Sequence, residues 1–302
     1  MKEETPPLQK SRFPKWLTVL LKIAVSIACL WYVSGKIDFA KAGAALKAAN
    51  WFYLFLALIA FILSKLIAAF RLNIYFRNIN IHLPEKQNIR LYWQGMYYNL
   101  FLPGSISGDA YKVVQLTKKY GVPYKKTTTA VLLDRFSGLL GLGLILAVYS
   151  LLVLDKPLFI AGIVAGAVAA VIILYLVIRF YLKEFTSSFF PTLLLGTAVQ
   201  VCQVICAYLI MASLGIPAHV TEYIFIFLVS SVVSVLPLTV GGIGIREVVF
   251  LEGSKYFGLM NETSVIISLL FYLITLFTSA WGLIYVFRDP LVEKKISHPL
   301  SE

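Results

Sequence analysis

The sequence predicts an all-α polytopic membrane protein. Of its 302 residues, 59% are hydrophobic and 14% are charged, and the mean hydropathy is +0.82, a composition that excludes an ordinary soluble domain. Apolar runs of about 20 residues, the length that crosses a bilayer as a helix, recur along the chain. Two stretches rich in glycine and proline interrupt them. We therefore expect about six full spans and two broken helical segments.

The first span is expected at residues 16–33, after a basic tail at residues 1–15. The run is long for a signal peptide and further spans follow, which favours an uncleaved span. A second span is expected at residues 51–70, with Lys65 and Arg71 at or beyond its far end, where cations commonly flank the membrane.

Four further spans follow along the chain. One of them carries Gly162 and Gly166, a small-residue spacing that lets a neighbouring helix approach closely. The expected spans cover residues 127–154, 158–178, 191–213 and 265–287.

The two broken segments, residues 98–115 and 234–249, are degraded copies of one motif. A plain spanning helix cannot hold them, because proline and glycine free backbone groups that hydrocarbon leaves unsatisfied. In each copy a glycine follows five residues after a Leu-Pro proline, and a cation follows nine residues after it: Pro103, Gly108 and Lys112 in the first, and Pro237, Gly242 and Arg246 in the second.

Lysine and arginine placement predicts the topology. The N-terminal tail, residues 71–90, residues 112–126 and the C-terminal tail are basic and are expected in the cytoplasm, whereas the loops at residues 155–156 and 214–222 are expected outside. Each motif region then starts and finishes on one side. We expect two re-entrant hairpins entering from opposite faces, with arms of roughly 14 residues that reach the midplane. The alternative is eight kinked spans.

The chain then divides into inverted repeats at about residues 16–154 and 158–288. Together they form a single transmembrane domain, residues 16–288, followed by a cytoplasmic tail at residues 289–302. Inverted repeats whose broken helices meet near the midplane are typical of secondary transporters.

Both motifs favour an anion site. The second arm of each hairpin is expected to begin near its glycines, where unpaired N–H groups and a cation on the first turn suit a lipid phosphate. The structural alternative is that the glycines only allow tight packing while the cations extend to the interface. The residues expected to shape the break and the cavity are Asn99, Pro103, Gly104, Gly108, Pro237, Gly241, Gly242 and Gly244.

Asp134 and Arg135 lie inside the span at residues 127–154. Each charge costs about 2.5–3.5 kcal/mol at the bilayer centre, so both should face protein or water. Neighbouring helical residues point about 100° apart and cannot simply pair with each other. We expect partners on the hairpins: Asp109 or Glu247 for Arg135, and Lys112 or Arg246 for Asp134. A structural ion pair that holds the bundle together is an equal alternative.

Polar side chains at Gln94, Asn99, Gln200 and Gln203 either line a headgroup path or form interhelical hydrogen bonds. No nucleophile set, metal-ligand cluster or nucleotide-binding loop is visible, so neither enzymatic activity nor a cofactor is expected. The net charge of +12 comes from cations flanking spans, and nucleic-acid binding is not expected.

Several motifs resemble the transmembrane region of lysylphosphatidylglycerol synthases, a flippase-like integral membrane family. They are Leu102-Pro103-Gly104 with Gly108-Asp109, Leu133-Asp134-Arg135 with Gly138, and Pro237 with Gly241-Gly242-Ile243-Gly244-Ile245-Arg246-Glu247. In bifunctional relatives this part is credited with moving aminoacylated phosphatidylglycerol between leaflets, and a soluble domain makes the lipid. This chain resembles the translocating half only.

The expected function is a lipid translocator of the plasma (bacterial inner) membrane, with both termini cytoplasmic. It would move an anionic or modified phospholipid or a lipid-linked headgroup between leaflets. Lys112, Arg135 and Arg246 would hold the phosphate, and Asp109, Asp134 and Glu247 would balance them. The alternatives are a non-transporting partner of a glycosyltransferase or envelope-lipid biosynthetic enzyme, and a small-anion carrier.

Overall fold

The computed structural model describes residues 15–36, 38–101, 106–236, 239, 242–287 and 290–291. All regular structure in these residues is helical, which confirms the predicted class. Two 3₁₀ helices, η1 (Lys183–Ser188) and η2 (Trp281–Tyr285), accompany the α-helices. These are α1 (Lys15–Ser34), α2 (Phe39–Ala48), α3 (Trp51–Asn78), α4 (Glu85–Phe101), α5 (Ser107–Tyr120), α6 (Tyr124–Val153), α7 (Pro157–Tyr181), α8 (Phe189–Ser213), α9 (Val220–Val235), α10 (Ile245–Phe257) and α11 (Asn261–Ala280).

Five helical segments are long and apolar enough to cross a membrane. They correspond to the second and all later predicted spans: Trp51–Asn78, Tyr124–Val153, Pro157–Tyr181, Lys183–Ser213 and Asn261–Tyr285. The first predicted span coincides with α1, whose apolar part, Ile23–Ser34, is shorter. A sixth span therefore stays a prediction.

The two motifs interrupt the helices where the sequence predicts. α4 ends at Phe101 and α5 begins at Ser107, and α9 ends at Val235 before α10 begins at Ile245. Four of the predicted break residues lie outside the described residues: Pro103, Gly104, Pro237 and Gly241.

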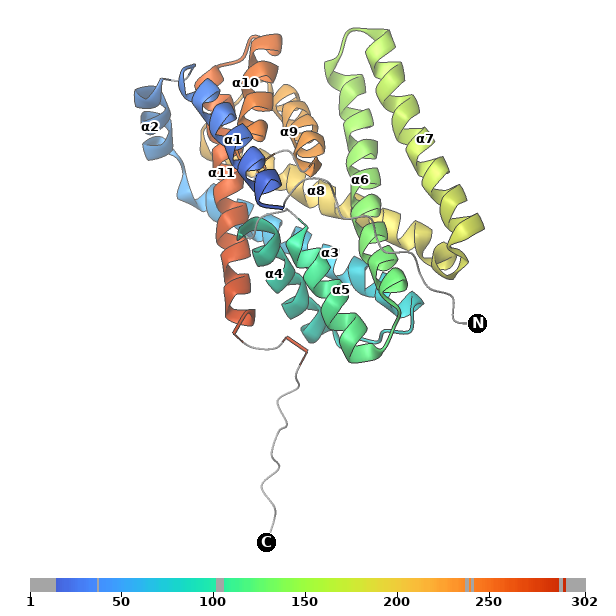
Figure 1. Ribbon diagram of the computed structural model, residues 1–302. Coiled ribbons are helices and arrows are strands. Elements are labelled where there is room, and N and C mark those ends of the chain that lie inside the picture. Colours follow the sequence, from blue (N-terminus) through green and yellow to red (C-terminus); the bar gives the residue numbers. More distant parts are fainter. Residues whose placement is uncertain are drawn as a thin grey trace.

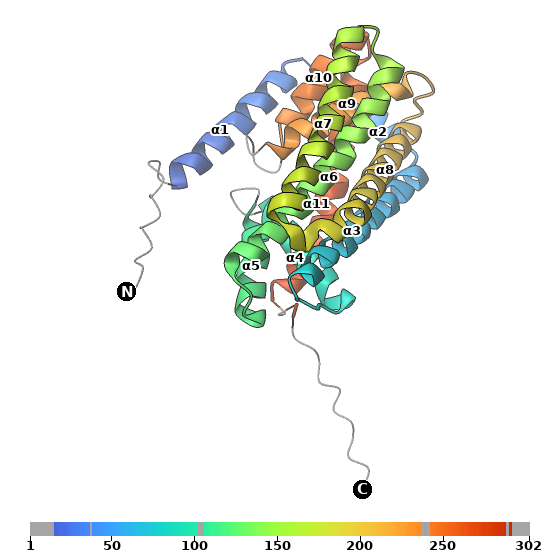
Figure 2. The same ribbon diagram turned by 90° about the vertical axis from the view of Figure 1, so that its right-hand side faces the viewer.

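The paired short helices occupy opposite ends of the bundle (Figure 1). α4 and α5 pack together at the lower end of that view, and α9 and α10 pack together at the upper end. α3 and α8 run side by side between them, as Figure 2 also shows. α6 packs against α9, while α11 packs against α4. α1 lies at the edge of the bundle beside α10.

Helices approach each other closely where a glycine leaves no side chain between their backbones. A Cβ atom on Gly141 of α6 would lie 2.6 Å from the carbonyl carbon of Gly196 in α8, and one on Gly196 would lie 2.5 Å from the carbonyl oxygen of Ser137. Backbones that approach this closely gain van der Waals contact, which is the main attraction between helices in lipid.

Two expectations about the spans are wrong for the described residues. Gly162 and Gly166 bring no neighbouring helix close, because a Cβ on either would meet nothing within 4 Å. α7 lies on the outside of the bundle, packed on α6 and η1. α3 also continues eight residues past the predicted end at residue 70, to Asn78. Arg71 therefore lies within the helix and is buried.

Gly141→Ala is expected to destabilise the protein by about 1–3 kcal/mol, because the added methyl group collides with the backbone of α8. Gly166→Ala makes the same chemical change in open space and is expected to be neutral or slightly stabilising through helix propensity. Thermal unfolding in detergent micelles measures both. Equal melting temperatures for the two variants would contradict the close α6–α8 contact.

Candidate functional site

Two adjoining polar cavities lie inside the bundle, with volumes of about 320 Å³ and 230 Å³. Lys65 and Ser234 line both of them. The polar and charged residues of the larger cavity are Lys65, Arg71, Tyr92, Arg135, Gln200, Gln203 and Ser234. Those of the smaller cavity are Lys65, Asn99, Ser234, Thr275 and Ser279. No carboxylate is among the described residues that line either cavity. The site is therefore cationic.

Asp134 pairs with Arg71. The prediction that its partner is Lys112 or Arg246 is wrong. The Nε atom of Arg71 lies 2.7 Å from Oδ1 of Asp134, and both side chains are buried. Gly138 and Gly196 make room for the guanidinium, since a Cβ on them would lie 3.1 Å and 3.3 Å from its Nη1 atom. The sequence analysis missed Arg71 because it placed this residue at the membrane interface.

Arg135 pairs with Asp109, as predicted. Its Nε–H donates to Oδ2 of Asp109, whose Oδ1 atom lies 3.1 Å from Nζ of Lys112. One carboxylate on α5 thus holds two cations, of which Arg135 belongs to α6 and also lines the larger cavity. This side chain joins the cavity wall to the α4–α5 pair.

Lys112 is a packing element of the α4–α5 pair. It is 4% exposed and does not line either cavity. A Cβ on Gly95 of α4 would lie only 2.3 Å from Cε of Lys112. The Nζ atom lies 4.7 Å from the ring centroid of Tyr92. Lys112 therefore crosses from α5 to α4 and stabilises Asp109.

Glu247 caps α10. Its Oε2 atom accepts the Gly244 N–H at 2.7 Å, and its Oε1 atom accepts the Ser268 hydroxyl at 2.9 Å. Gly242 and Gly244 take positive φ angles, 84° and 86°, which suit glycine in the turn before the helix. Gly242 also lines the smaller cavity.

Arg246 lies against aromatic rings and a hydroxyl. Its guanidinium carbon is 4.7 Å from the Phe271 ring centroid and 5.8 Å from that of Phe227. Its Nε–H donates to Ser234 Oγ at 3.3 Å. Arg246 is not itself among the described lining residues, but its hydrogen bond to Ser234 connects it to the wall that Lys65 and Ser234 form in both cavities. Arg246 takes part in no ion pair among the described residues.

Asn99 joins the two arms of the first motif. Its Oδ1 atom accepts the Gly108 N–H at 2.9 Å, and its side chain also lines the smaller cavity. Gly108 has no room for a side chain, because a Cβ there would lie 1.9 Å from the Gly95 carbonyl oxygen. Of the other polar candidates, Gln200 and Gln203 line the larger cavity, whereas Gln94 bonds the Tyr285 carbonyl oxygen.

Lys65 is the principal residue that the sequence analysis missed. Its Nζ atom lies 4.4 Å from the Phe61 ring centroid, and it lines both cavities. It also takes part in no ion pair among the described residues. The available signal was its position more than one helical turn before the end of the apolar run at Phe70, too far inside for an interfacial cation.

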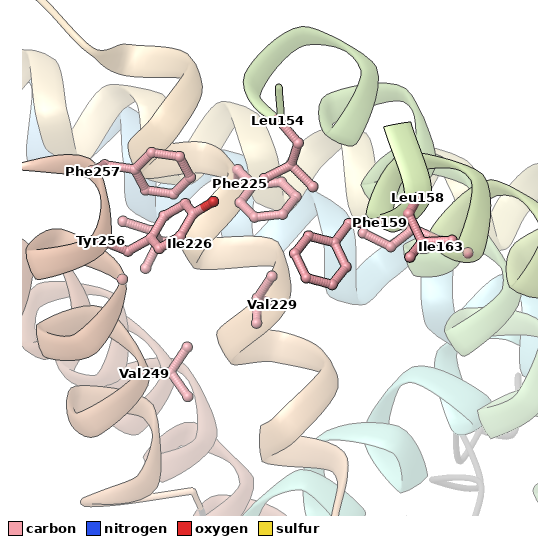
Figure 3. A pocket seen from close by; sticks show the side chains of 12 residues that line it. Leu154, Leu158, Phe159, Ile163, Phe225, Ile226, Val229, Val249, Tyr256 and Phe257 are labelled. Atoms are coloured by element: carbon pink, nitrogen blue, oxygen red, sulfur yellow. The ribbon is translucent and has the colours of Figure 1, made fainter. Parts of the chain in front are cut away.

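A larger cleft, of about 500 Å³, is apolar (Figure 3). It lies between the turn that joins α6 to α7 and the α9–α10 pair, with Phe159 on one side and Tyr256 on the other. Among the described residues of its lining, the Tyr256 hydroxyl is the only polar side-chain group. The cleft therefore offers no charged recognition, in contrast to the two cavities.

Fold and site together define an α-helical polytopic membrane protein with a cationic cavity between its helices. The chain belongs to the Lysylphosphatidylglycerol synthase TM region family, whose sequence model matches residues 19–282. The match covers the transmembrane region, and it identifies no catalytic domain. A comparison with curated proteins gives no match.

Asp134→Ala is expected to destabilise the protein by about 3–5 kcal/mol, because it leaves the Arg71 guanidinium buried without its carboxylate. The matched control is Glu184→Ala, which removes the exposed partner of Lys126, 2.8 Å away. Exposed pairs of this kind contribute about 0–1 kcal/mol. Thermal or denaturant unfolding in micelles compares the two, and similar losses would contradict a structural role for the Arg71–Asp134 pair.

Proposed function

We propose that this protein is a lipid translocator of the plasma (bacterial inner) membrane. It moves a phospholipid or lipid-linked headgroup between leaflets through the two cavities. The observation that carries this proposal is the cationic lining: Lys65, Arg71 and Arg135 face space inside an apolar bundle, and no described carboxylate lines that space. Charged side chains inside a membrane bundle are costly and commonly mark a substrate path.

Two re-entrant hairpins form the core of the proposed architecture. α4, α5, α9 and α10 have 17, 14, 16 and 13 residues, fewer than the roughly 20 that a spanning helix needs. Their positions at opposite ends of the bundle support hairpins that enter from opposite faces (Figure 1). With α1 as the sixth span, the chain forms two inverted repeats, residues 16–154 and 158–288.

The contacts between helices support this repeat. α3 and α8 take corresponding places in the two halves, and they pack against each other along the middle of the molecule. α6 contacts the α9 arm, and α11 contacts the corresponding α4 arm. Each hairpin is thus held by the last helix of the other half, as expected for halves related by an axis in the membrane plane.

Basic residues gather at the end of the bundle that holds the α5–α6 and α7–α8 connections. Lys118, Lys119, Lys125 and Lys126 border the first connection, and Lys183 lies in the second. We assign this end to the cytoplasm, with both termini on the same side.

The headgroup site uses Lys65, Arg135 and Arg246 as phosphate ligands, because charge-assisted hydrogen bonds to phosphate are among the strongest polar contacts. Asp109 holds Arg135 in place, and Lys112 stabilises Asp109 from within the α4–α5 pair. Lys112 therefore acts on the site through Asp109. The smaller cavity, bordered by Asn99 and Gly242, extends the polar space toward both broken segments.

Arg246→Ala is expected to abolish lipid translocation in proteoliposomes, because it removes a guanidinium at the wall shared by the cavities. Lys112→Ala is expected to lower translocation strongly by freeing Asp109 from one of its two cations. Lys126→Ala, at an exposed ion pair outside both cavities, is the control and should transport normally. A fluorescent-lipid dithionite assay measures the rates, and melting temperatures verify folding. Undiminished translocation in the Arg246→Ala/Lys112→Ala double variant would contradict the proposed site.

The topology predicts that residues 118 and 156 lie on opposite sides of the membrane. Lys118→Cys and Lys156→Cys are placed singly in a background where Cys29, Cys202 and Cys206 are replaced by serine. An impermeant maleimide should label Lys156→Cys in intact cells and Lys118→Cys only after the membrane is opened. Labelling of both variants from one side would overturn the assignment.

A further inference from the structure

The charged groups inside the bundle do not balance. Among the residues that the structure describes, its interior carries five cations and three carboxylates, an excess of two positive charges. They are Lys65, Arg71, Lys112, Arg135 and Arg246 against Asp109, Asp134 and Glu247. The undescribed segments between the hairpin arms, within residues 102–105 and 237–241, contain only Leu, Pro, Gly, Ser and Val at the undescribed positions, none of them ionisable. They therefore leave this difference unchanged.

The excess is concentrated at the cavities. Arg71 is neutralised by Asp134, and Asp109 serves both Lys112 and Arg135. Glu247 caps α10 but keeps its negative charge, so it offsets one of the two cations Lys65 and Arg246. The other excess charge belongs to the Asp109 cluster, whose Arg135 lines the larger cavity. Lys65 and Arg246 form no ion pair among the described residues, and their nearest described partners are aromatic rings and Ser234.

Ser234 brings these two cations to one place. Its side chain lines both cavities together with Lys65, and its Oγ atom accepts the Arg246 Nε–H at 3.3 Å. The same Oγ donates to the Ser230 carbonyl oxygen at 2.6 Å, which fixes the hydroxyl on α9. Lys65 from α3 and Arg246 from α10 thus approach one wall from opposite halves of the chain.

An excess of two positive charges among apolar helices carries a desolvation cost, which a counter-charge of equal size offsets best. A phosphodiester supplies one negative charge. A phosphomonoester supplies about 1.5 to 2 negative charges at pH 7, and a pyrophosphate supplies at least as many. Both also present several acceptor oxygens to a lysine and an arginine at the same time.

We propose that the two cavities bind a phosphate group with two negative charges, a phosphomonoester or a pyrophosphate, in preference to a phosphodiester, and that Lys65 and Arg246 are its principal ligands. The part of this inference that attaches the phosphate to a lipid rests on the proposed function. The charge preference itself depends only on the cavity. The site thereby distinguishes lipids by the charge of the headgroup phosphate.

The test compares phosphatidic acid, a phosphomonoester lipid, with phosphatidylglycerol, a phosphodiester lipid with the same acyl chains. Native mass spectrometry of the purified protein in mixed micelles counts each bound lipid. We expect phosphatidic acid to be retained about tenfold better. Lys65→Gln and Arg246→Gln should each weaken its retention by about tenfold, the loss of affinity that corresponds to one charge-assisted hydrogen bond. Phosphatidylglycerol retention should change much less.

Controls separate charge from folding. Lys65→Arg keeps the charge and should keep the preference, while Lys156→Gln, in the α6–α7 connection, should leave all retention unchanged. Equal retention of the two lipids by the unaltered protein would overturn the inference. Equal losses for both lipids in Lys65→Gln, with an unchanged melting temperature, would also overturn it.

Inorganic pyrophosphate separates the inference from the proposed function. If it displaces phosphatidic acid and binds equally well without lipid, the charge preference holds, and a free-anion carrier replaces the lipid translocator. If phosphatidic acid and phosphatidylglycerol are translocated at equal rates and bound equally, the translocator holds and the preference for two charges is wrong.

Discussion

Arg71 and Asp134 meet at 2.7 Å in the interior of the bundle, and the packing of three helices depends on this ion pair. Neither charge is tolerable there without the other. Gly138 on α6 and Gly196 on α8 supply the space for the guanidinium of α3. The residues that bury this ion pair therefore also belong to the tight α6–α8 contact, to the α3–α8 contact and to one wall of the larger cavity.

A second charge cluster connects the cavity to the first broken segment. Asp109 binds Arg135 of α6 and Lys112 of its own helix, α5, while Asn99 of α4 accepts the Gly108 N–H at the start of α5. Arg135 also belongs to the cavity lining. The position of α5 and the electrostatics of the cavity thus depend on the same side chain. Lys112 contributes through packing and through Asp109, and its burial accounts for the glycine at position 95.

Family membership places the chain among integral membrane proteins of lipid metabolism, but the family does not specify the ligand. The ligand is constrained instead by charge. In the second motif Arg246 bonds the cavity-lining Ser234 and Glu247 caps α10, so the two neighbouring residues have different roles. This division leaves the cavity positive, and the excess points to an anionic partner.

The sequence by itself named Asp109 as one of two candidate partners of Arg135. It determined the helical class, five of the expected spans and the two helix breaks. These features depend on local composition: apolar length sets a span, and proline or glycine stops it. Only the tertiary structure decided which cations face the cavities. Lys65 and Arg71 fit the pattern of residues flanking a membrane, and a local pattern does not distinguish an interfacial cation from an interior one. The same limit applies to glycines. Gly141 and Gly196 meet another backbone while Gly162 and Gly166 face open space, because close packing is a property of two helices and a sequence pattern describes only one.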